Sequence, residues 1–219
     1  MPREPQATSW HLRGAPDDHD GELWAVGGDL APGTLLAAYR LGLFPMPVHG
    51  TIGWFSPARR GIVPLGSFSA SRSLRRARRD FEIRIDTDFA AVVRGCMRPG
   101  EPESWIDDTI LAAYVDLHGL GWAHSIEAWD TSGLAGGLYG VAIGGLFAAE
   151  SMFHARTGGS KAAFLALVDV LRAGGDTDRR LLDVQWLTPH LETLGAVEIA
   201  RAEYRSRLET ALRLDAAFA

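Results

Sequence analysis

An apolar, glycine-rich run from Leu134 to Ala149 limits the fold of this chain more than any other feature. The run is shorter than a membrane-spanning helix, and its five glycines weaken helical structure further. Gly144 and Gly145 separate two apolar segments, which is the sequence pattern of a tight β-hairpin. We therefore predict two neighbouring strands in the core of a sheet, joined at this pair of glycines, and no membrane span.

Helices and strands are expected to alternate around this hairpin from Ser71 onward. Ser71 and Ser160 are expected to cap the helices that follow them, a position that serine favours. This order predicts a central mixed sheet flanked by helices, hence an α/β (α+β) fold, and the hairpin favours an acyltransferase-like sheet over a doubly wound nucleotide-binding one. In chain order, the expected elements are helix 71–80, strand 81–86, helices 88–97 and 107–119, strands 122–130, 134–143 and 146–153, helix 160–173, strand 181–187, a short helix from 188, and a last strand and helix.

The first 60 residues differ in character from the rest of the chain, because they are rich in Gly, Pro and Trp and contain only short elements. A helix is expected from Pro32 to Leu41, since Gly42 and the prolines after it prevent continuation. We predict a small N-terminal domain at residues 1–60, either an accessory domain or a lid, and a domain with the acyltransferase-like sheet at residues 61–219.

The composition of the chain is that of an ordinary globular protein. It has 219 residues, 47% hydrophobic and 22% charged, enough to bury a sizeable core. The single cysteine, Cys96, excludes an intrachain disulfide framework and agrees with a reducing compartment. The first ten residues lack the apolar segment of a secretory signal, so we expect a cytoplasmic protein. The seven histidines show no metal-ligand spacing, and no metal is expected.

One short segment is strongly basic, although the net charge of −5 excludes a generic polyanion binder. Arg72, Arg75, Arg76 and Arg79 recur at helical spacing and would form one stripe along the helix predicted at 71–80. Like charges on successive turns repel each other, so either a polyanion or buried carboxylates must neutralise this stripe. We favour contact with nucleic-acid phosphates.

The sequence Gly-Gly-Ser-Lys at 158–161 raises the question of a phosphate-binding loop. It lacks the glycine spacing of a nucleoside-triphosphate loop, and no Ser or Thr follows the lysine. We interpret it as a turn followed by a helix cap at Ser160, with Lys161 exposed in the first turn. A single phosphate at the helix N-terminus stays open as the alternative.

Three polar residues lie inside otherwise apolar segments, where a polar group without a partner is unfavourable. Because side chains alternate along a strand, Glu150 is expected to share a face with Met152. There it either pairs with an arginine or lines a pocket walled by Met152 and Leu138. Asp183 and Gln185 are two residues apart and are expected to share a face. They form either a hydrogen-bonded core pair or a clamp that orients an amine nucleophile and accepts its proton.

Seven blocks of the chain, in order, resemble the bacterial leucyl/phenylalanyl-tRNA–protein transferases. The resemblance runs from about Trp24 to Arg207, and the order of the short motifs makes it specific. The blocks are VGGDLAPGTLLAAYRLGLFP, WFSPARR, SRSLRR, SWIDDTILAAYVDLHGLGWAHSIEAW, GGLYGVAIGGLFAAESMF, GGSKAAF and LDVQWLTPHLETLGAVEIAR.

The resemblance implies an enzyme that transfers Leu or Phe, and Met less well, from aminoacyl-tRNA to the α-amino group of an N-terminal Lys or Arg, marking the acceptor protein for N-degron degradation. It implies a small N-terminal domain on an acetyltransferase-like (GNAT-type) domain, without coenzyme A or another cofactor. Asp183 and Gln185 would handle the acceptor's amino group, and Glu150 would lie near the 3′ adenosine and the reacting ester. The resemblance implies that Leu138, Phe147 and Met152 form the pocket for the transferred side chain, and that Met46 and Trp105 lie near the adenosine. Ser151 is a further substrate-binding position.

The chain departs from the usual pattern of that family at two of these places. Met46 stands where the family has Trp, which weakens stacking on the adenosine, and Ala149 stands where Gly usually precedes the glutamate. Two other functions stay open. One is a coenzyme A-dependent N-acetyltransferase, in which Gly-Gly-Ser-Lys would have to bind pyrophosphate. The other is a non-catalytic RNA-binding module, for which the arginine helix is sufficient.

Overall fold

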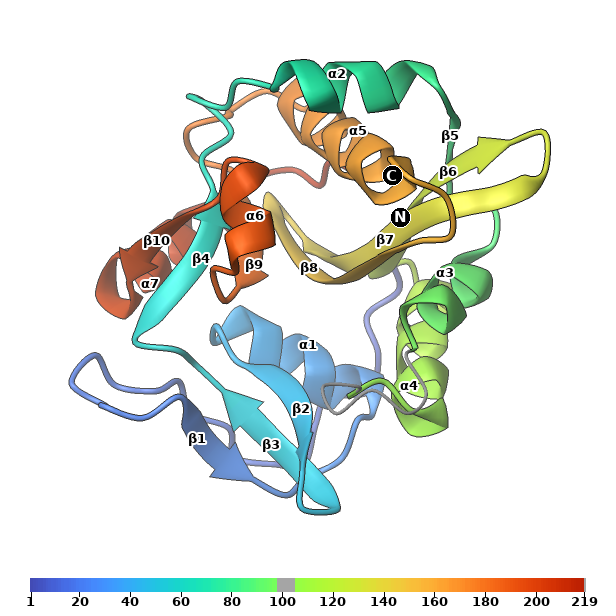
Figure 1. Cartoon of the computed structure of the whole chain (residues 1–219). Coiled ribbons are helices and arrows are strands. Elements are labelled where there is room, and N and C mark those ends of the chain that lie inside the picture. The colour runs from blue at the N-terminus through green and yellow to red at the C-terminus, as the bar shows by residue number, and fades with distance from the viewer. Residues whose placement is uncertain (98–104, 219) are drawn as a thin grey trace.

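The computed structural model describes residues 1–97 and 105–218, which form two β-sheets with helices packed around them (Figure 1). The smaller sheet has three antiparallel strands in the order β1-β3-β2, and the larger has seven strands in the order β10-β4-β9-β8-β7-β6-β5. The small sheet consists of β1 (Leu23–Val26), β2 (Phe44–Val48) and β3 (Thr51–Phe55). The large sheet consists of β4 (Arg59–Val63), β5 (Glu82–Ile85), β6 (Ala123–Asp130), β7 (Gly133–Ile143), β8 (Leu146–His154), β9 (Leu181–Gln185) and β10 (Val197–Ala200).

The helices lie on both faces of the large sheet, so the predicted mixed α/β fold with a small N-terminal part is confirmed (Figure 1). α2 packs on α5, and α5 covers one face over β6, β7 and β8, while α3 and α4 cover the other face. The helices are α1 (Pro32–Arg40), α2 (Arg72–Arg79), α3 (Phe89–Cys96), α4 (Asp108–Gly119), α5 (Gly159–Ala173), α6 (Pro189–Thr193) and α7 (Arg201–Ala211).

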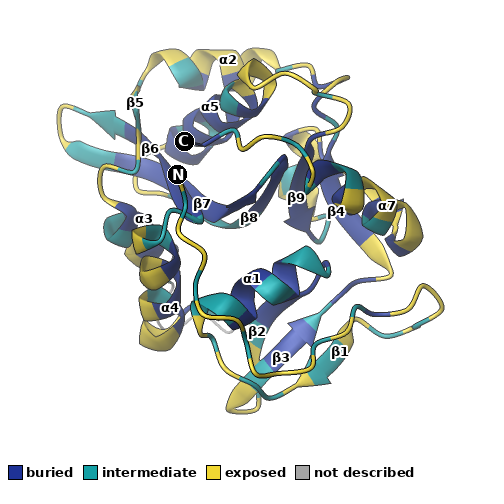
Figure 2. Cartoon of the chain, turned by 180° about the vertical axis from the view of Figure 1, so that it is seen from behind, coloured by how far each residue is buried: buried dark blue, intermediate teal, exposed yellow. Residues whose placement is uncertain are grey.

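The hairpin predicted from the glycine pair is formed by β7 and β8. Ile143 lies opposite Leu146, and Gly144 has a φ of 58°, the left-handed conformation that a tight turn requires. β8 pairs antiparallel with β7 and parallel with β9, which makes the sheet mixed. Figure 2 shows that β7 and β9 are largely buried and that α2 and α7 expose their outer sides, while the second half of β8 is only partly buried.

A β-bulge interrupts the pairing of β7 with β8 at the position that matters most for function. Tyr139 lies opposite Ser151 and Gly140 lies opposite Ala149, so Glu150 is the extra, unpaired residue between them. The bulge shifts the alternation of the side chains. Met152 therefore packs with Leu138 in the apolar cluster beneath α5, instead of sharing a face with Glu150 as the sequence predicted.

The neighbouring strand β9 is also irregular at its end. Its pairing with β8 runs from Leu181 to Asp183 and stops there, and Gln185 has a φ of 57°. A left-handed residue of this kind reverses the direction of its side chain relative to a regular strand. β8 and β9 therefore present Glu150 and Gln185 where their pairing has ended.

The Gly-Gly-Ser-Lys segment forms a turn and the start of α5, but Ser160 is not its cap. Gly158, with a φ of 95°, precedes the helix, and no side chain caps it. The first residue of α5, Gly159, lies directly against the backbone of β7. A Cβ at this position would come within 2.5 Å of the carbonyl oxygen of Ala135, so the position requires glycine. The other predicted cap is confirmed, since Ser71 Oγ accepts from the backbone N–H of Leu74 at 3.2 Å.

The two sheets share one apolar cluster, which joins α1 and the small sheet to α3, α4 and one face of the large sheet. Its members include Leu35, Trp54, Val92 and Tyr114. β4 begins at Arg59 and belongs to the large sheet, so that sheet starts two residues before the boundary predicted at 60/61. The division into two domains stays a prediction. Among the described residues, no helix has the length and apolar composition needed to cross a membrane.

Candidate active site

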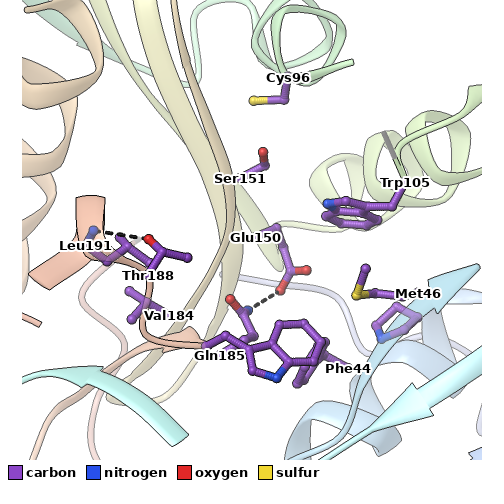
Figure 3. A pocket seen from close by; sticks show the side chains of 12 residues that line it. Phe44, Met46, Cys96, Trp105, Glu150, Ser151, Val184, Gln185, Thr188 and Leu191 are labelled. Carbon is purple, nitrogen blue, oxygen red and sulfur yellow. Dashed lines mark hydrogen bonds between the residues drawn. The ribbon is translucent and has the colours of Figure 1, made fainter. Parts of the chain in front are cut away.

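A cavity of about 460 Å³ opens between the small sheet, the middle of β8 and the end of β9 (Figure 3). Its walls are largely apolar, and a few polar groups converge in it, which is the usual character of a small-molecule site. Residues from β2, α3, β8 and β9 contribute, so distant parts of the chain meet here. The lining consists of Phe44, Pro45, Met46, Cys96, Trp105, Glu150, Ser151, Val184, Gln185, Trp186, Thr188 and Leu191.

Glu150 is placed in this cavity by the bulge and is held there from two sides. Gln185 Nε2 donates to Oε1 of Glu150 at 3.1 Å (Figure 3). The Tyr114 hydroxyl donates to Oε2 at 3.2 Å. The sequence left open whether this carboxyl group pairs with an arginine or lines a pocket. It lines the pocket, and both residues that donate to it here, Gln185 and Tyr114, are uncharged.

The environment of Glu150 favours its neutral form. Burial, the largest effect, raises the pKa of its carboxyl group to about 8, and the charge of Asp183 acts in the same direction. The hydroxyl groups of Tyr39 and Tyr114 and the charge of Arg60 oppose this rise. At neutral pH the group is therefore mostly protonated, and it can donate a proton or a hydrogen bond as well as accept one.

Asp183 lies behind the cavity and does not line it. Its carboxylate forms a bidentate ion pair with Arg60, at 2.8 and 2.6 Å, and accepts from the Tyr204 hydroxyl at 2.8 Å. Both members of the pair are essentially inaccessible to solvent. Arg60 is stacked between the rings of Phe44 and Tyr204. The negative charge is thus fully neutralised by a buried partner.

Asp183 and Gln185 do not form the shared face predicted from their spacing. Asp183 turns to Arg60, whereas Gln185 turns to Glu150, because the left-handed backbone at Gln185 breaks the alternation. The two residues remain connected, since Asp183 Oδ1 accepts from the backbone N–H of Gln185 at 2.9 Å. Asp183 therefore fixes the backbone that carries Gln185, and Gln185 faces the cavity.

The other predicted substrate-binding residues fall into two groups. Met46, Trp105 and Ser151 line the cavity together with Glu150 and Gln185 (Figure 3). Leu138, Phe147 and Met152 do not. They belong to the apolar cluster beneath α5, where Leu138 and Phe147 are fully buried. The predicted pocket walled by Glu150, Met152 and Leu138 is therefore absent from the described residues, because the bulge places Glu150 on the other face.

Comparison with known proteins assigns the chain to a family. The family model for the leucyl/phenylalanyl-tRNA protein transferase matches residues 62–209, and the model for the N-terminal domain of that transferase matches residues 28–58. The chain belongs to this family. Leucyl/phenylalanyl-tRNA–protein transferases of Cereibacter sphaeroides (strain ATCC 17029) and Ruegeria pomeroyi are each 50% identical to it. These matches cover 86% and 87% of this chain, and 88% and 90% of the relatives. That of Herpetosiphon aurantiacus is 46% identical over 86% of this chain and 98% of its own.

Family membership makes the chain a transferase enzyme, and the two matched segments contain both walls of the cavity. The N-terminal match includes Met46 from β2, and the larger match includes Glu150 and Gln185. Within the described residues, His, Cys, Asp and Glu side chains form no group of three or more that could hold a metal ion.

The arginine stripe of this transferase is exposed, as its helical spacing predicted. Leu74 and Ala77 are the buried residues of α2, and the four stripe arginines face solvent. Within the described part of the chain, none of the four forms an ion pair with a carboxylate. Lys161, from the first turn of α5, lies 3.4 Å from Ser73 Oγ and extends the basic surface toward β8. The stripe residues are Arg72, Arg75, Arg76 and Arg79.

Sequence reasoning missed four residues that hold the site of this transferase together. Arg60 and Tyr204 neutralise Asp183, while Tyr39 and Tyr114 contact each other and reach Glu150. The only signal for them was indirect, since a carboxylate inside an apolar strand requires a partner elsewhere. Nothing in the spacing of the sequence indicates which distant residue supplies it.

Proposed function

We propose that this transferase moves a leucyl or phenylalanyl group, and a methionyl group less well, from aminoacyl-tRNA to the α-amino group of an N-terminal Lys or Arg of an acceptor protein. The modified protein would then be marked for N-degron degradation in the cytoplasm. The donor residues follow the names of the relatives, and the acceptor residues follow the resemblance of the motifs. The observation that carries the proposal is the cavity itself, where Glu150 and Gln185 are hydrogen-bonded to each other beneath apolar and aromatic walls.

The proposed chemistry is an aminolysis of an ester. The amine nitrogen attacks the carbonyl carbon of the aminoacyl ester, the bond to the ribose oxygen breaks, and that oxygen takes up a proton lost by the amine. The ester is already activated, so the enzyme has mainly to hold the two reactants in register. A protein α-amino group has a pKa of about 7.7–8.0, so a useful fraction is neutral near pH 7.

In this proposal different residues of the cavity contact different parts of the substrates. Met46 and Trp105 flank the terminal adenosine, and Gln185 and Glu150 contact the amine and the ester. Asp183 cannot touch the substrate where it lies. It acts through Gln185, by accepting the backbone N–H of that residue. This assigns Asp183 to positioning, whereas the sequence had suggested direct contact with the acceptor amine.

The apolar residues proposed to bind the transferred side chain do not lie in the cavity, so they must move for that side chain to reach them. Leu138, Phe147 and Met152 pack together beneath α5 on the opposite face of the sheet from Glu150. None of the three lines the cavity, so a leucyl or phenylalanyl side chain bound in the cavity can contact them only if these side chains move. We therefore expect donor binding to move these three side chains apart and to shift their NMR methyl and aromatic signals.

A transfer assay tests the proposed function directly. Labelled Leu-tRNA or Phe-tRNA is incubated with the protein and a peptide beginning with Arg, or with the same peptide acetylated at that amine. Label is expected on the free-amine peptide only. Gln185→Ala is expected to lower kcat/KM about 10- to 100-fold, because it removes a donor from the reacting centre. Gln6→Ala, at an exposed position in the N-terminal segment, is the matched control.

The outcomes of this assay separate the three candidate functions. Tight tRNA binding without any transfer would favour the RNA-binding module. Modification of the peptide by acetyl-coenzyme A, with none by aminoacyl-tRNA, would favour the N-acetyltransferase. Gln185 is the better residue to vary than Asp183, because removing a buried charge partner also threatens folding.

The arginine stripe is proposed to contact phosphates of the tRNA acceptor stem. Reversing two charges in Arg75→Glu/Arg76→Glu is expected to weaken tRNA binding about tenfold or more at ~0.1 M salt. The slope of log K against the logarithm of the salt concentration should fall by about one for each arginine that no longer neutralises a phosphate. Arg207→Glu/Arg213→Glu, on and just beyond α7, changes the net charge equally and serves as the control. Equal weakening in both double variants would mean that only the overall charge matters, and unchanged binding would make the stripe structural.

A further inference from the structure

Three buried tyrosines lie around the inner side of Glu150, and the mechanism above uses none of them. Tyr39 from α1 and Tyr114 from α4 bring their hydroxyl oxygens within 2.5 Å of each other. Tyr139 from β7 packs edge-on against Tyr114, with ring centroids 5.4 Å apart. All three are at most 2% exposed. Burying a hydroxyl group is unfavourable unless it forms a hydrogen bond, so the arrangement of these groups requires an explanation.

The direction of the hydrogen bonds follows from counting protons. The Tyr114 hydroxyl has a single proton and donates it to Oε2 of Glu150. When Glu150 is ionised, the short contact with Tyr39 uses the proton of Tyr39, with Tyr114 as acceptor. The result is a chain from Tyr39 to Tyr114 to Glu150, and the Tyr39 hydroxyl also lowers the pKa of the carboxyl group. Gln185 donates to the other carboxyl oxygen, Oε1.

This chain of donors is suited to an ionised carboxylate, yet burial of the carboxyl group favours the acid form. Burial raises the pKa of Glu150 to about 8 and raises the pKa of Tyr39 and Tyr114 well above their ordinary value. The tyrosines therefore remain protonated, and available as donors, over the whole pH range in which Glu150 titrates. Other ionisable groups face the carboxyl group or its hydroxyl partners from neighbouring elements, namely Arg60 of β4, Cys96 of α3, Tyr139 of β7 and Asp183 of β9.

We propose that Tyr39 and Tyr114 are positioning residues for Glu150, which orient its carboxyl group into the cavity and stabilise its ionised form when the ammonium group of a substrate enters. Entry of an ammonium group then converts the carboxylic acid to a carboxylate, and one proton is released to solvent. The ammonium group and the carboxylate form an ion pair, so charge balances inside the cavity. The inference rests on the proposed function, because it is the two substrates of that reaction that carry primary amines.

A direct titration of Glu150 tests this inference without any transfer assay. The protein is labelled with ¹³C at the glutamate side-chain carboxyl groups, and the Glu150 signal is assigned by its loss in Glu150→Gln. We expect this signal to titrate near pH 8 in the unmodified chain. Tyr114→Phe removes the donor on Oε2 and should move the midpoint upward by about one pH unit, as expected for a hydrogen bond to a charged group.

Tyr139→Phe is the matched control for the same measurement. It removes a hydroxyl group of equal size from the same cluster, but this hydroxyl has no hydrogen-bond partner among the described residues. The titration midpoint of Glu150 in this variant should equal that in the unmodified chain. Equal shifts in both variants, or a midpoint near 4.5 in the unmodified chain, would overturn the inference. Should Tyr114→Phe not fold, Tyr39→Phe takes its place and is also expected to shift the midpoint upward, because the Tyr39 hydroxyl likewise lowers the pKa of Glu150.

Transfer kinetics then distinguish this inference from the proposed function. If the enzyme transfers aminoacyl groups, the limb of the pH–rate profile assigned to Glu150 should move upward in Tyr114→Phe and stay fixed in Tyr139→Phe. If no transfer occurs but the ¹³C midpoints move as expected, the positioning role stands and the proposed function falls. If transfer occurs and the midpoints do not differ between the variants, the positioning role falls alone.

Discussion

Arg60→Met is expected to lower the free energy of unfolding by about 3–5 kcal/mol, because it leaves the Asp183 carboxylate buried without its charge partner. The present pair has two hydrogen bonds and no solvent access, so neither water nor salt can replace the missing guanidinium group. Arg60 also fills the space between the rings of Phe44 and Tyr204, so its removal weakens packing as well. Urea denaturation at pH 7 measures the effect.

The double variant Arg60→Met/Asp183→Leu is the control for this prediction. It removes both charges together, and replacing a buried ion pair by apolar side chains is often neutral or stabilising. We therefore expect the double variant to be more stable than Arg60→Met alone. If the double variant is the less stable of the two, the stability resides in packing around Arg60 and not in charge neutralisation.

Glu150→Gln is expected to stabilise the protein at pH 8 while lowering its activity. The pKa of Glu150 rises from an ordinary 4.5 to about 8 on folding. Its contribution to stability is therefore fully present below pH 4.5 and is lost progressively as the pH rises toward 8. Glutamine keeps the shape of the side chain without this titration. We expect a gain on the order of 4 kcal/mol at pH 8 and one of about 1 kcal/mol or less at pH 5.

Thermal unfolding at both pH values, together with the transfer assay, checks the second prediction. Glu192→Gln changes an exposed carboxyl group by the same chemistry, and its effect on Tm should be small and alike at both pH values. A stability gain for Glu150→Gln that is equal at pH 5 and pH 8 would contradict the pKa assignment. An unchanged transfer rate would exclude the carboxyl group from the reaction.

The sequence was most informative where the signal is local. The Gly144-Gly145 turn, the Ser71 cap and the buried face of α2 each depend on residues a few positions apart, and each is present in the structure. The arginine stripe followed from the same helical periodicity.

Two kinds of feature could not be predicted from the sequence. These are the β-bulge and the contacts between residues that are far apart in the sequence. One extra residue at Glu150 reverses the face of Met152, and no residue type marks a bulge in advance. Arg60 and Asp183 are 123 positions apart, and a pattern of single residues does not say which of the chain's arginines a carboxylate will meet. The tyrosine pair is separated by 75 positions, so the same reason applies to it.

The cavity is bounded by β2 near one end of the chain and by Leu191 near the other. During synthesis on the ribosome, the first wall therefore leaves the exit tunnel long before the second one exists. The segment that carries Leu191 must have left the tunnel before the cavity can have all of its walls, so the cavity forms only after both distant segments have been made.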